Sequence, residues 1–182
     1  MPRTVLTRPE LLEKARKIKL LVLDVDGVLS DGKIYFDNNG LETKSFNTLD
    51  GQGLKQLKKS GVELAIITGR KSAIVERRAK ELGIELLIQG REDKFVALQE
   101  ILAKYPCELE NIAHMGDDWP DLCVMSKVGL ALGVANGHWQ VKELADWISE
   151  RKGGEGAVRD ACDMLMLAQG TYQQALAPYV SL

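Results

Sequence analysis

The sequence predicts an α/β protein built on a doubly wound parallel sheet, and three observations favour this fold. Short apolar runs that end in polar or glycine residues recur along the chain, and residues 18–23 are the clearest example. Such runs are typical of strands buried on both faces of a parallel sheet. Segments with helical spacing separate these runs, and this alternation places helices on both faces of the sheet. A hairpin insertion at residues 32–47 interrupts the alternation.

The apolar runs and the helical spacing assign the elements in chain order. Helices are expected at residues 9–17, 52–60, 72–82 and 93–105, in a short segment after residue 121, and at 157–169. Strands are expected at residues 18–23, 63–67, 86–88, 112–115, 128–132 and 146–148. Gly61 and Gly83 follow the second and third helices, as glycine commonly does at a helix end. We expect residues 157–169 to be the terminal helix.

The insertion carries a strong hairpin signal. Residues 34–36 and 43–46 are extended in character and flank a turn that ends in Asn39-Gly40. An isolated hairpin is marginal in water, and this one carries apolar side chains such as Phe36. The hairpin therefore packs against its own domain or against hairpins of other subunits, and we favour an oligomer.

Length and composition restrict the function. The 182 residues fit a single domain over 1–182, with a glycine-rich tail and terminal helix at about 151–170. A net charge of −2 gives no basic footprint for nucleic acid. The three scattered cysteines, Cys107, Cys123 and Cys162, favour neither disulfides nor a zinc site and are typical of a reducing cytoplasm. Without an apolar run long enough to span a bilayer, we expect a cytoplasmic protein with no membrane partner.

Two carboxylates follow the first buried strand. Asp24 and Asp26 are separated by one residue and are followed by Gly27. Like charges this close repel unless a cation lies between them or one carboxyl keeps its proton. The first case indicates Mg²⁺, which prefers oxygen ligands, and the second indicates a general acid. An acidic turn with no function is the alternative for this pair taken alone.

Polar residues follow two further strands. Thr68 follows the strand at 63–67, and Asp117 and Asp121 follow the strand at 112–115. The carboxyl ends of parallel strands meet at one edge of the sheet, where α/β proteins bind ligands. Each residue alone has a structural explanation as a helix cap or an acidic first turn. Their coincidence at one edge predicts a site.

These residues form a recognisable series. The motifs are Asp24-Val25-Asp26-Gly27-Val28, Thr68-Gly69-Arg70, Lys94, and Gly116-Asp117-Asp118 through Asp121. In order and spacing the series resembles the haloacid-dehalogenase superfamily of phosphatases, over nearly the whole chain. The resemblance implies that Asp24 is the nucleophile that takes the phosphoryl group. It implies that Asp26 protonates the leaving alcohol and then activates water.

The resemblance also implies a cofactor and supporting residues. Mg²⁺ is expected to be bound by Asp24, by Asp26 through its backbone carbonyl, and by Asp117. Thr68 and Lys94 are expected to hold the phosphoryl oxygens, with Asp118 and Asp121 in support. A carboxylate nucleophile and a phosphate dianion carry charge of the same sign, so cations must compensate for their repulsion. Without metal we expect almost no activity.

The gaps between the motifs are too short for a cap domain, which larger members of the superfamily carry. The chain most resembles a capless branch that acts on the phosphate of an eight-carbon sugar acid, a lipopolysaccharide precursor. The segments that carry this match are Leu49-Asp50-Gly51-Gln52-Gly53, Ile66-Ile67-Thr68-Gly69-Arg70-Lys71, Gln89-Gly90 and Gly153-Gly154-Glu155-Gly156-Ala157-Val158-Arg159. The resemblance implies a homotetramer whose hairpins meet at its centre, with the glycine-rich tail closing over an active site.

A sugar acid carries a carboxylate remote from its phosphate, so a second cationic region is expected. The candidate substrate-binding residues are Gly69, Arg70, Arg78 and Arg159. The three arginines are included because a guanidinium can bind a carboxylate through two hydrogen bonds. A phosphatase of a nine-carbon sugar acid 9-phosphate remains an alternative. A receiver-like binding module is a less favoured one, because the acid–base carboxylate Asp26 hastens loss of a phosphoryl group. We expect His114, on an apolar strand, to be a packed core residue.

Overall fold

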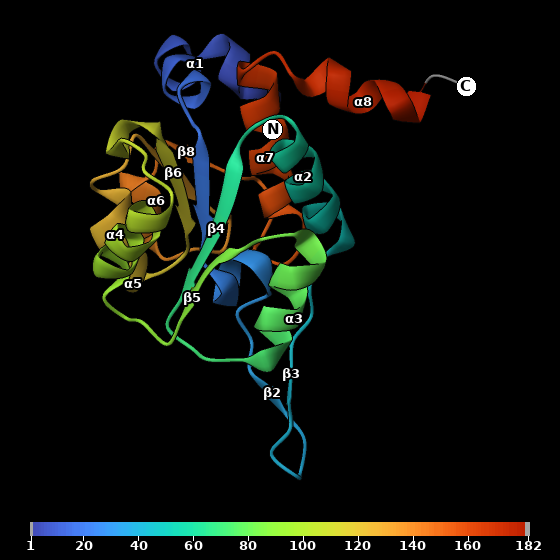
Figure 1. The fold of residues 1–182 in the computed structure, drawn as a ribbon, viewed down its shortest axis with the longest axis vertical. Helices are drawn as coiled ribbons and strands as arrows, with labels where there is room; N and C mark the ends of the chain where they lie inside the picture. The colour runs from blue at the N-terminus through green and yellow to red at the C-terminus, as the bar shows by residue number, and fades with distance from the viewer. Residues whose placement is uncertain (1, 181–182) are drawn as a thin grey trace.

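The computed structural model describes residues 2–180, and a six-stranded parallel sheet lies at its centre (Figure 1). The strands are β1 (Leu20–Leu23), β4 (Glu63–Thr68), β5 (Leu86–Gln89), β6 (Ile112–Gly116), β7 (Leu130–Gly133) and β8 (Trp147–Ile148), in the order β5-β4-β1-β6-β7-β8. β1 pairs in parallel with β4 on one side and with β6 on the other. The chain thus winds outward from β1 in both directions, which confirms the doubly wound prediction.

Helices cover both faces of the sheet. They are α1 (Pro9–Arg16), α2 (Thr48–Lys59), α3 (Ala73–Leu82), α4 (Lys94–Lys104), α5 (Trp119–Met125), α6 (Trp139–Leu144), α7 (Ala157–Ala168) and α8 (Tyr172–Val180), preceded by a 3₁₀ turn at Pro2–Thr7. Successive residues of a strand face opposite sides. Leu21 and Leu23 accordingly join the core cluster that contains α2 and α7, whereas Leu20 and Val22 join the cluster that contains α4.

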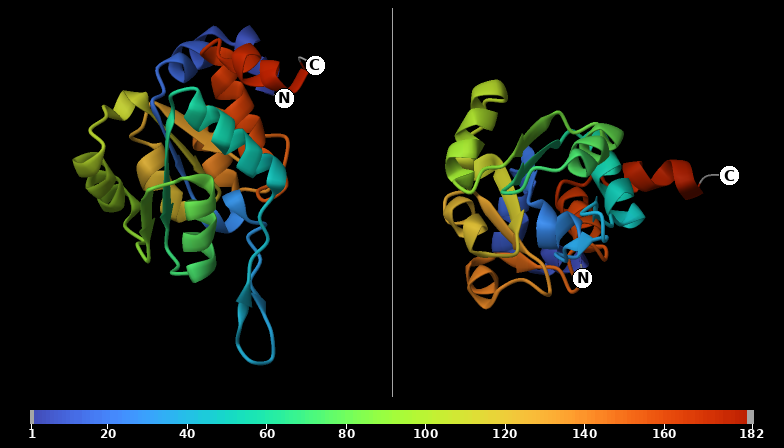
Figure 2. Two further views of the ribbon diagram at one scale, coloured as in Figure 1. Left: turned by 45° about the vertical axis from the view of Figure 1, so that its right-hand side comes forward. Right: turned by 90° about the horizontal axis from the view of Figure 1, so that it is seen from below.

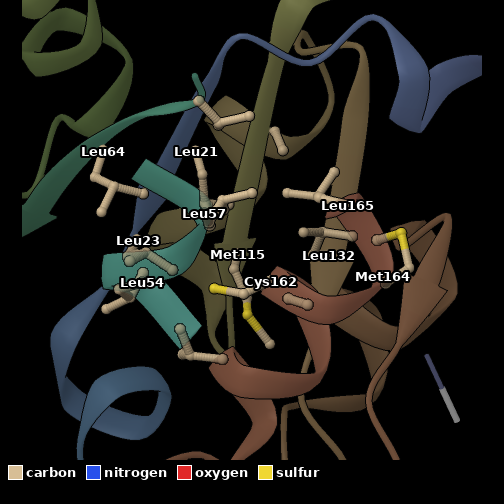
Figure 3. Packing of buried hydrophobic residues seen from close by; sticks show 14 of the residues in the cluster. Leu21, Leu23, Leu54, Leu57, Leu64, Met115, Leu132, Cys162, Met164 and Leu165 are labelled. Carbon is tan, nitrogen blue, oxygen red and sulfur yellow. The ribbon is translucent and has the colours of Figure 1, made fainter. Parts of the chain in front are cut away.

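The larger cluster is a continuous apolar layer between the sheet and α2 and α7. Figure 3 shows Leu54 and Leu57 of α2 and Leu165 of α7 gathered over the side chains of the strands. All three side chains are fully buried. This packing fixes the strands whose carboxyl ends carry the polar motifs.

Three differences from the sequence prediction concern helices. α2 begins at Thr48 rather than at residue 52, because the Asn47 side chain accepts the N–H of Leu49 and caps the first turn. α6 was not predicted. α7 is not the terminal helix, because α8 follows it and projects from the body of the molecule (Figure 1). α8 has no fully buried residue, although Tyr172, Ala175, Leu176 and Tyr179 lie at helical spacing and were a readable signal for a helix.

The predicted hairpin is present and projects from the body (Figures 1 and 2). Its strands β2 (Tyr35–Phe36) and β3 (Glu42–Thr43) pair antiparallel, with the second strand shorter and earlier than the predicted 43–46. The Asp37 side chain accepts the backbone N–H groups of Asn39 and Leu41, which closes the turn. Phe36 and Leu41 are 63% and 66% exposed. No helix among residues 2–180 has the length and apolar character needed to cross a bilayer.

Candidate active site

A cavity of about 750 Å³ opens at the carboxyl ends of β1, β4 and β6. The predicted residues that line it are Asp24, Asp26, Thr68, Gly69, Arg70, Lys94, Asp117, Asp118 and Asp121. Four separate stretches of sequence thus contribute to one acidic hollow. The structure brings these residues together, as the strand-end rule requires.

The turn after β1 places its two carboxylates by means of a glycine. Asp24 is extended, and the irregular helical turn Val25–Leu29 that follows contains Gly27 at φ 97°. A Cβ atom on Gly27 would lie 2.0 Å from Oδ2 of Asp117. Only glycine combines this backbone conformation with so close an approach, so Gly27 allows the first and last motifs to meet.

Lys94 lies between two buried carboxylates. Its Nζ donates to Oδ1 of Asp24 and to Oδ1 of Asp121, each at 2.7 Å. Burial raises the pKa of Asp24 to about 6, against the opposing effect of Lys94. Burial alone would lower the pKa of Lys94, but the two carboxylates outweigh it and raise that pKa. The ammonium therefore stays charged beside the expected nucleophile.

Asp121 is a supporting residue with both oxygens engaged. Oδ1 also accepts a hydrogen bond from Nε2 of His114 at 2.8 Å, and Oδ2 accepts the N–H groups of Asp117 and Asp118 at 3.2 and 3.4 Å. Burial would raise the pKa of Asp121, but His114 and Lys94 hold it below its usual range. His114 is fully buried, as predicted, yet it also contacts the site, which the sequence analysis missed.

The site suits a hard divalent cation. Carboxylate oxygens of Asp24, Asp117 and Asp121 lie within 4.8 Å of one another. Burial and the neighbouring charges of Asp24 and Asp121 raise the pKa of Asp117 to about 8. A cation would relieve this repulsion, and an all-oxygen donor set fits Mg²⁺. Asp121 is the poorest ligand of the three, because both of its oxygens already accept hydrogen bonds.

The structure separates the three candidate arginines. Arg70 lines the acidic cavity, and its Nη2 donates to Glu42 of the hairpin at 2.6 Å. The guanidinium of Arg78 instead lies over the ring of Phe46, 5.8 Å from its centre. Arg159 is bound through Nε to Asp163 at 2.8 Å and lines a separate cavity of about 250 Å³. Within this chain, Arg78 and Arg159 do not reach the predicted site.

The glycine-rich segment packs against the turn after β1 and does not line the cavity. The N–H of Gly154 donates to the carbonyl of Val28 at 2.9 Å. A Cβ atom on Gly153 would lie 1.6 Å from the carbonyl oxygen of Gly27. The glycines at 153 and 154 are therefore needed for close backbone packing against the turn after β1, and within this chain they do not form the lid that was expected.

Two hairpin residues at the site were missed by sequence reasoning. Nζ of Lys44 contacts Oδ1 of Asp26 and lies 3.4 Å from Oε1 of Glu42. Residues two apart on an extended segment face the same side, so the pair Glu42 and Lys44 was a readable signal for a charged face. Its target could not be read, because the direction of the hairpin relative to the sheet is a tertiary feature.

Comparison with known proteins identifies the family. A family model described as haloacid dehalogenase-like hydrolase matches residues 86–160. The chain is 49% identical over 167 residues to 3-deoxy-D-manno-octulosonate 8-phosphate phosphatase of Salmonella typhimurium, covering 92% of this chain and 89% of that protein.

Solved structures agree. The phosphatase of the same name from Moraxella catarrhalis, in complex with magnesium ion, phosphate ion and KDO, has a TM-score of 0.90 and 47% identity, covering 92% of this chain and 97% of that one. The Yersinia pestis phosphatase has a TM-score of 0.88 and 46% identity, covering 90% and 89%. The chain belongs to the 3-deoxy-D-manno-octulosonate 8-phosphate phosphatase family of haloacid dehalogenase-like hydrolases.

Proposed function

We propose that this chain hydrolyses 3-deoxy-D-manno-octulosonate 8-phosphate to the free sugar acid and phosphate, a step in lipopolysaccharide precursor synthesis. The observation that carries the proposal is the position of Lys94 between Asp24 and Asp121 in the acidic cavity, in a chain 49% identical to an enzyme of that name. Lys94 is the cation beside Asp24, and its positive charge can also attract a phosphoryl group.

The side chains divide the reaction into two steps. A carboxylate oxygen of Asp24 attacks phosphorus, the bond to the sugar oxygen breaks, and Asp26 gives its proton to that oxygen. Asp26 then takes a proton from water, which attacks phosphorus and releases phosphate and free Asp24. Lys94 and Thr68 hold phosphoryl oxygens, and Thr68 is held in turn by a hydrogen bond from the N–H of Arg70 at 3.4 Å. Each proton given in the first step is recovered in the second.

Mg²⁺ completes the charge balance. We assign it to Asp24, Asp117 and the backbone carbonyl of Asp26, with Asp118 and Asp121 holding the acidic loop. When bound, Mg²⁺ supplies positive charge to the phosphoryl oxygens. The uncatalysed reaction is so slow that the enzyme must lower the activation free energy by over roughly 20 kcal/mol. General acid–base catalysis contributes a factor of only about 10² to 10⁴, so electrostatic stabilisation must dominate.

Arg70 is the residue we assign to the carboxylate of the sugar acid. It lines the cavity and already holds a carboxylate, that of Glu42, at 2.6 Å. The backbone of Gly69 lies beside it in the same wall. Arg78 and Arg159 lie outside this cavity, so we do not assign them to the carboxylate within one chain.

Assembly and location belong to the same proposal. The exposed Phe36 and Leu41 give the projecting hairpin an apolar surface of the kind that packs between subunits, which supports a homotetramer. We propose one phosphatase domain for the whole chain, without a cap. The scattered free cysteines support a cytoplasmic location.

Phosphate release from a panel of phosphorylated sugars, with Mg²⁺ and with EDTA, tests the proposal. The parent protein is compared with Asp24→Asn and with Glu100→Gln, a matched loss of charge on the exposed surface of α4. Metal-dependent preference for the eight-carbon substrate, lost only in Asp24→Asn, is the expected result. Preference for a nine-carbon 9-phosphate would keep the chemistry and change the substrate. A stable phosphorylated protein without turnover would indicate a receiver-like module instead.

A further inference from the structure

We propose that Lys44 is a positioning residue that aims the carboxyl group of Asp26 at the leaving oxygen of the substrate. The inference rests on the proposed function, in which Asp26 exchanges the proton. Lys44 stands on the hairpin, outside every motif of the sheet, and its Nζ contacts Oδ1 of Asp26. The hairpin therefore contributes to the catalytic machinery as well as to the surface of the molecule.

The side chain of Lys44 is buried. Its side chain is only 1% exposed, although Thr43 and Ser45 on either side are exposed. Lysine is almost never buried without partners, because removing its charge from water is costly. The partners here are Asp26 and Glu42. A lysine that served only to make the hairpin soluble would point into water.

The ion pairs around Lys44 form a continuous series. Asp26, Lys44, Glu42 and Arg70 alternate in charge, with Lys44 3.4 Å from Glu42 and Glu42 2.6 Å from Arg70. The series joins the turn after β1 to the hairpin, and the hairpin to the loop after β4. Once Asp26 has given up its proton, two anions and two cations cancel, so the series then orients side chains without adding net charge to the cavity.

The contact determines which oxygen of Asp26 faces the reaction. Oδ1 is committed to Lys44, so proton exchange with the leaving oxygen is assigned to Oδ2. The Asp26 side chain is 25% exposed and lines the cavity, which leaves it open to a substrate. A general acid must lie within hydrogen-bond reach of its target, and a carboxyl group that rotates freely spends less time there.

A leaving-group comparison separates positioning from a structural role. The variants are Lys44→Met, Lys44→Arg and the control Lys33→Met, which changes an exposed lysine of the same segment. Each is tested on the sugar 8-phosphate, whose alkoxide needs a proton, and on p-nitrophenyl phosphate, whose phenolate leaves without one. Single-turnover release of each leaving group is measured, together with KM, thermal stability and oligomer mass.

We expect Lys44→Met to slow release of the sugar by roughly tenfold or more, within the range of general acid catalysis, with KM nearly unchanged. Release of p-nitrophenolate should fall much less, Lys44→Arg should recover most of the rate, and Lys33→Met should match the parent. An equal fall on both substrates would assign Lys44 a structural role and overturn the proposal, as would an unchanged rate on the sugar phosphate. Lys44→Gln replaces the Met variant if that protein does not fold.

The same data distinguish this proposal from the proposed function. If the parent protein hydrolyses other alkyl phosphates but not the eight-carbon sugar acid phosphate, the substrate assignment fails, and the leaving-group comparison on the accepted alkyl phosphate still decides the role of Lys44. If the parent hydrolyses the sugar phosphate and Lys44→Met is equally active on it, only the role of Lys44 fails. If the parent hydrolyses no phosphomonoester, both fail.

Discussion

The ammonium of Lys94 lies 2.7 Å from the carboxylate of Asp24, and Lys94 is only 3% exposed to solvent. The same nitrogen holds Asp121 at the same distance. The three buried charges compensate one another. Removing any one of them leaves a buried charge without a full partner, which is costly.

Replacing Lys94 by Met should therefore affect stability as well as activity. We expect the free energy of unfolding at pH 8 to fall by about 3–5 kcal/mol, since Asp24 and Asp121 lose their shared cation. Without it the folded-state pKa of Asp24 rises further, so stability is retained at low pH and lost as the pH rises. Urea denaturation at pH 5 and pH 8 in EDTA measures this, with the exposed Lys104→Met on α4 as control. An equal loss at both pH values would contradict the explanation.

Magnesium affinity should increase with pH. In the metal-free protein the pKa of Asp117 is raised to about 8 and that of Asp24 to about 6, so both hold protons that a metal must displace. Affinity should therefore rise from pH 6 to above pH 8. Titration calorimetry in buffers of different ionisation enthalpy should detect proton release at pH 7. Asp117→Asn should bind weakly and release fewer protons, whereas affinity independent of pH would show that Asp117 is already ionised.

Asp50 lies away from the cavity, and it should make the free energy of unfolding depend on pH. Its Oδ1 accepts the N–H of Arg159 at 2.8 Å and joins the starts of α2 and α7, while the buried Oδ2 has no partner among the described residues. Burial raises its pKa to about 6. Its folded-state pKa lies above the unfolded value of 3.8. The contribution of Asp50 to stability is therefore fully present below about pH 4 and is lost as the pH rises through 6.

Asp50→Asn cannot ionise, so its stability should fall less than that of the parent between pH 4 and pH 7. Urea denaturation across this range measures the difference between the two proteins. Burial also raises the pKa of Asp163 on α7, so Asp163→Asn should weaken the pH dependence in the same direction and is measured beside Asp50→Asn. Parallel curves for the parent and Asp50→Asn would contradict the raised pKa.

The sequence was sufficient for the sheet and for most of the cavity. Strands such as β1 are buried on both faces, so their apolar runs are continuous and end where the polar motifs begin. Parallel topology then brings Asp24, Thr68 and Asp117 to one edge without any knowledge of side-chain contacts. What periodicity and chain direction determine can be read from one sequence.

Long-range contacts between separate elements could not be read in this way. Lys44 reaches Asp26 only because the base of the hairpin lies beside the turn after β1, and nothing local encodes that placement. Arg159 was expected at the site from resemblance, but the helix that carries it turns it towards Asp163. α8 is a different case, because its apolar residues have helical spacing that was readable, and only Pro178 within it weakens that signal.

His114 should stabilise the site through Asp121. Its Nε2 donates to Oδ1 of Asp121 at 2.8 Å in a fully buried position. We expect His114→Leu to lower the free energy of unfolding by about 1–3 kcal/mol, because a buried carboxylate loses a donor. His114→Gln carries an N–H donor and should recover part of this loss. Thermal denaturation of both variants measures it, and a Leu variant as stable as the parent would show that Lys94 alone satisfies Oδ1 of Asp121.

The hairpin should control assembly. Phe36 is 63% exposed and pairs with Glu42 across the hairpin, far from the sheet core. Replacing it by Asp places charge on the apolar surface that we propose to lie between subunits, so mass measured by light scattering should fall from tetramer towards monomer. Val96→Asp, at an apolar position on α4 that is 44% exposed, is the matched control and should leave the mass unchanged.

Because Glu42 and Lys44 hold Arg70 and Asp26, a loosened hairpin should also lower activity on the sugar phosphate. If the parent protein is already monomeric, the hairpin has no role in assembly, and its contacts with the cavity are its only role.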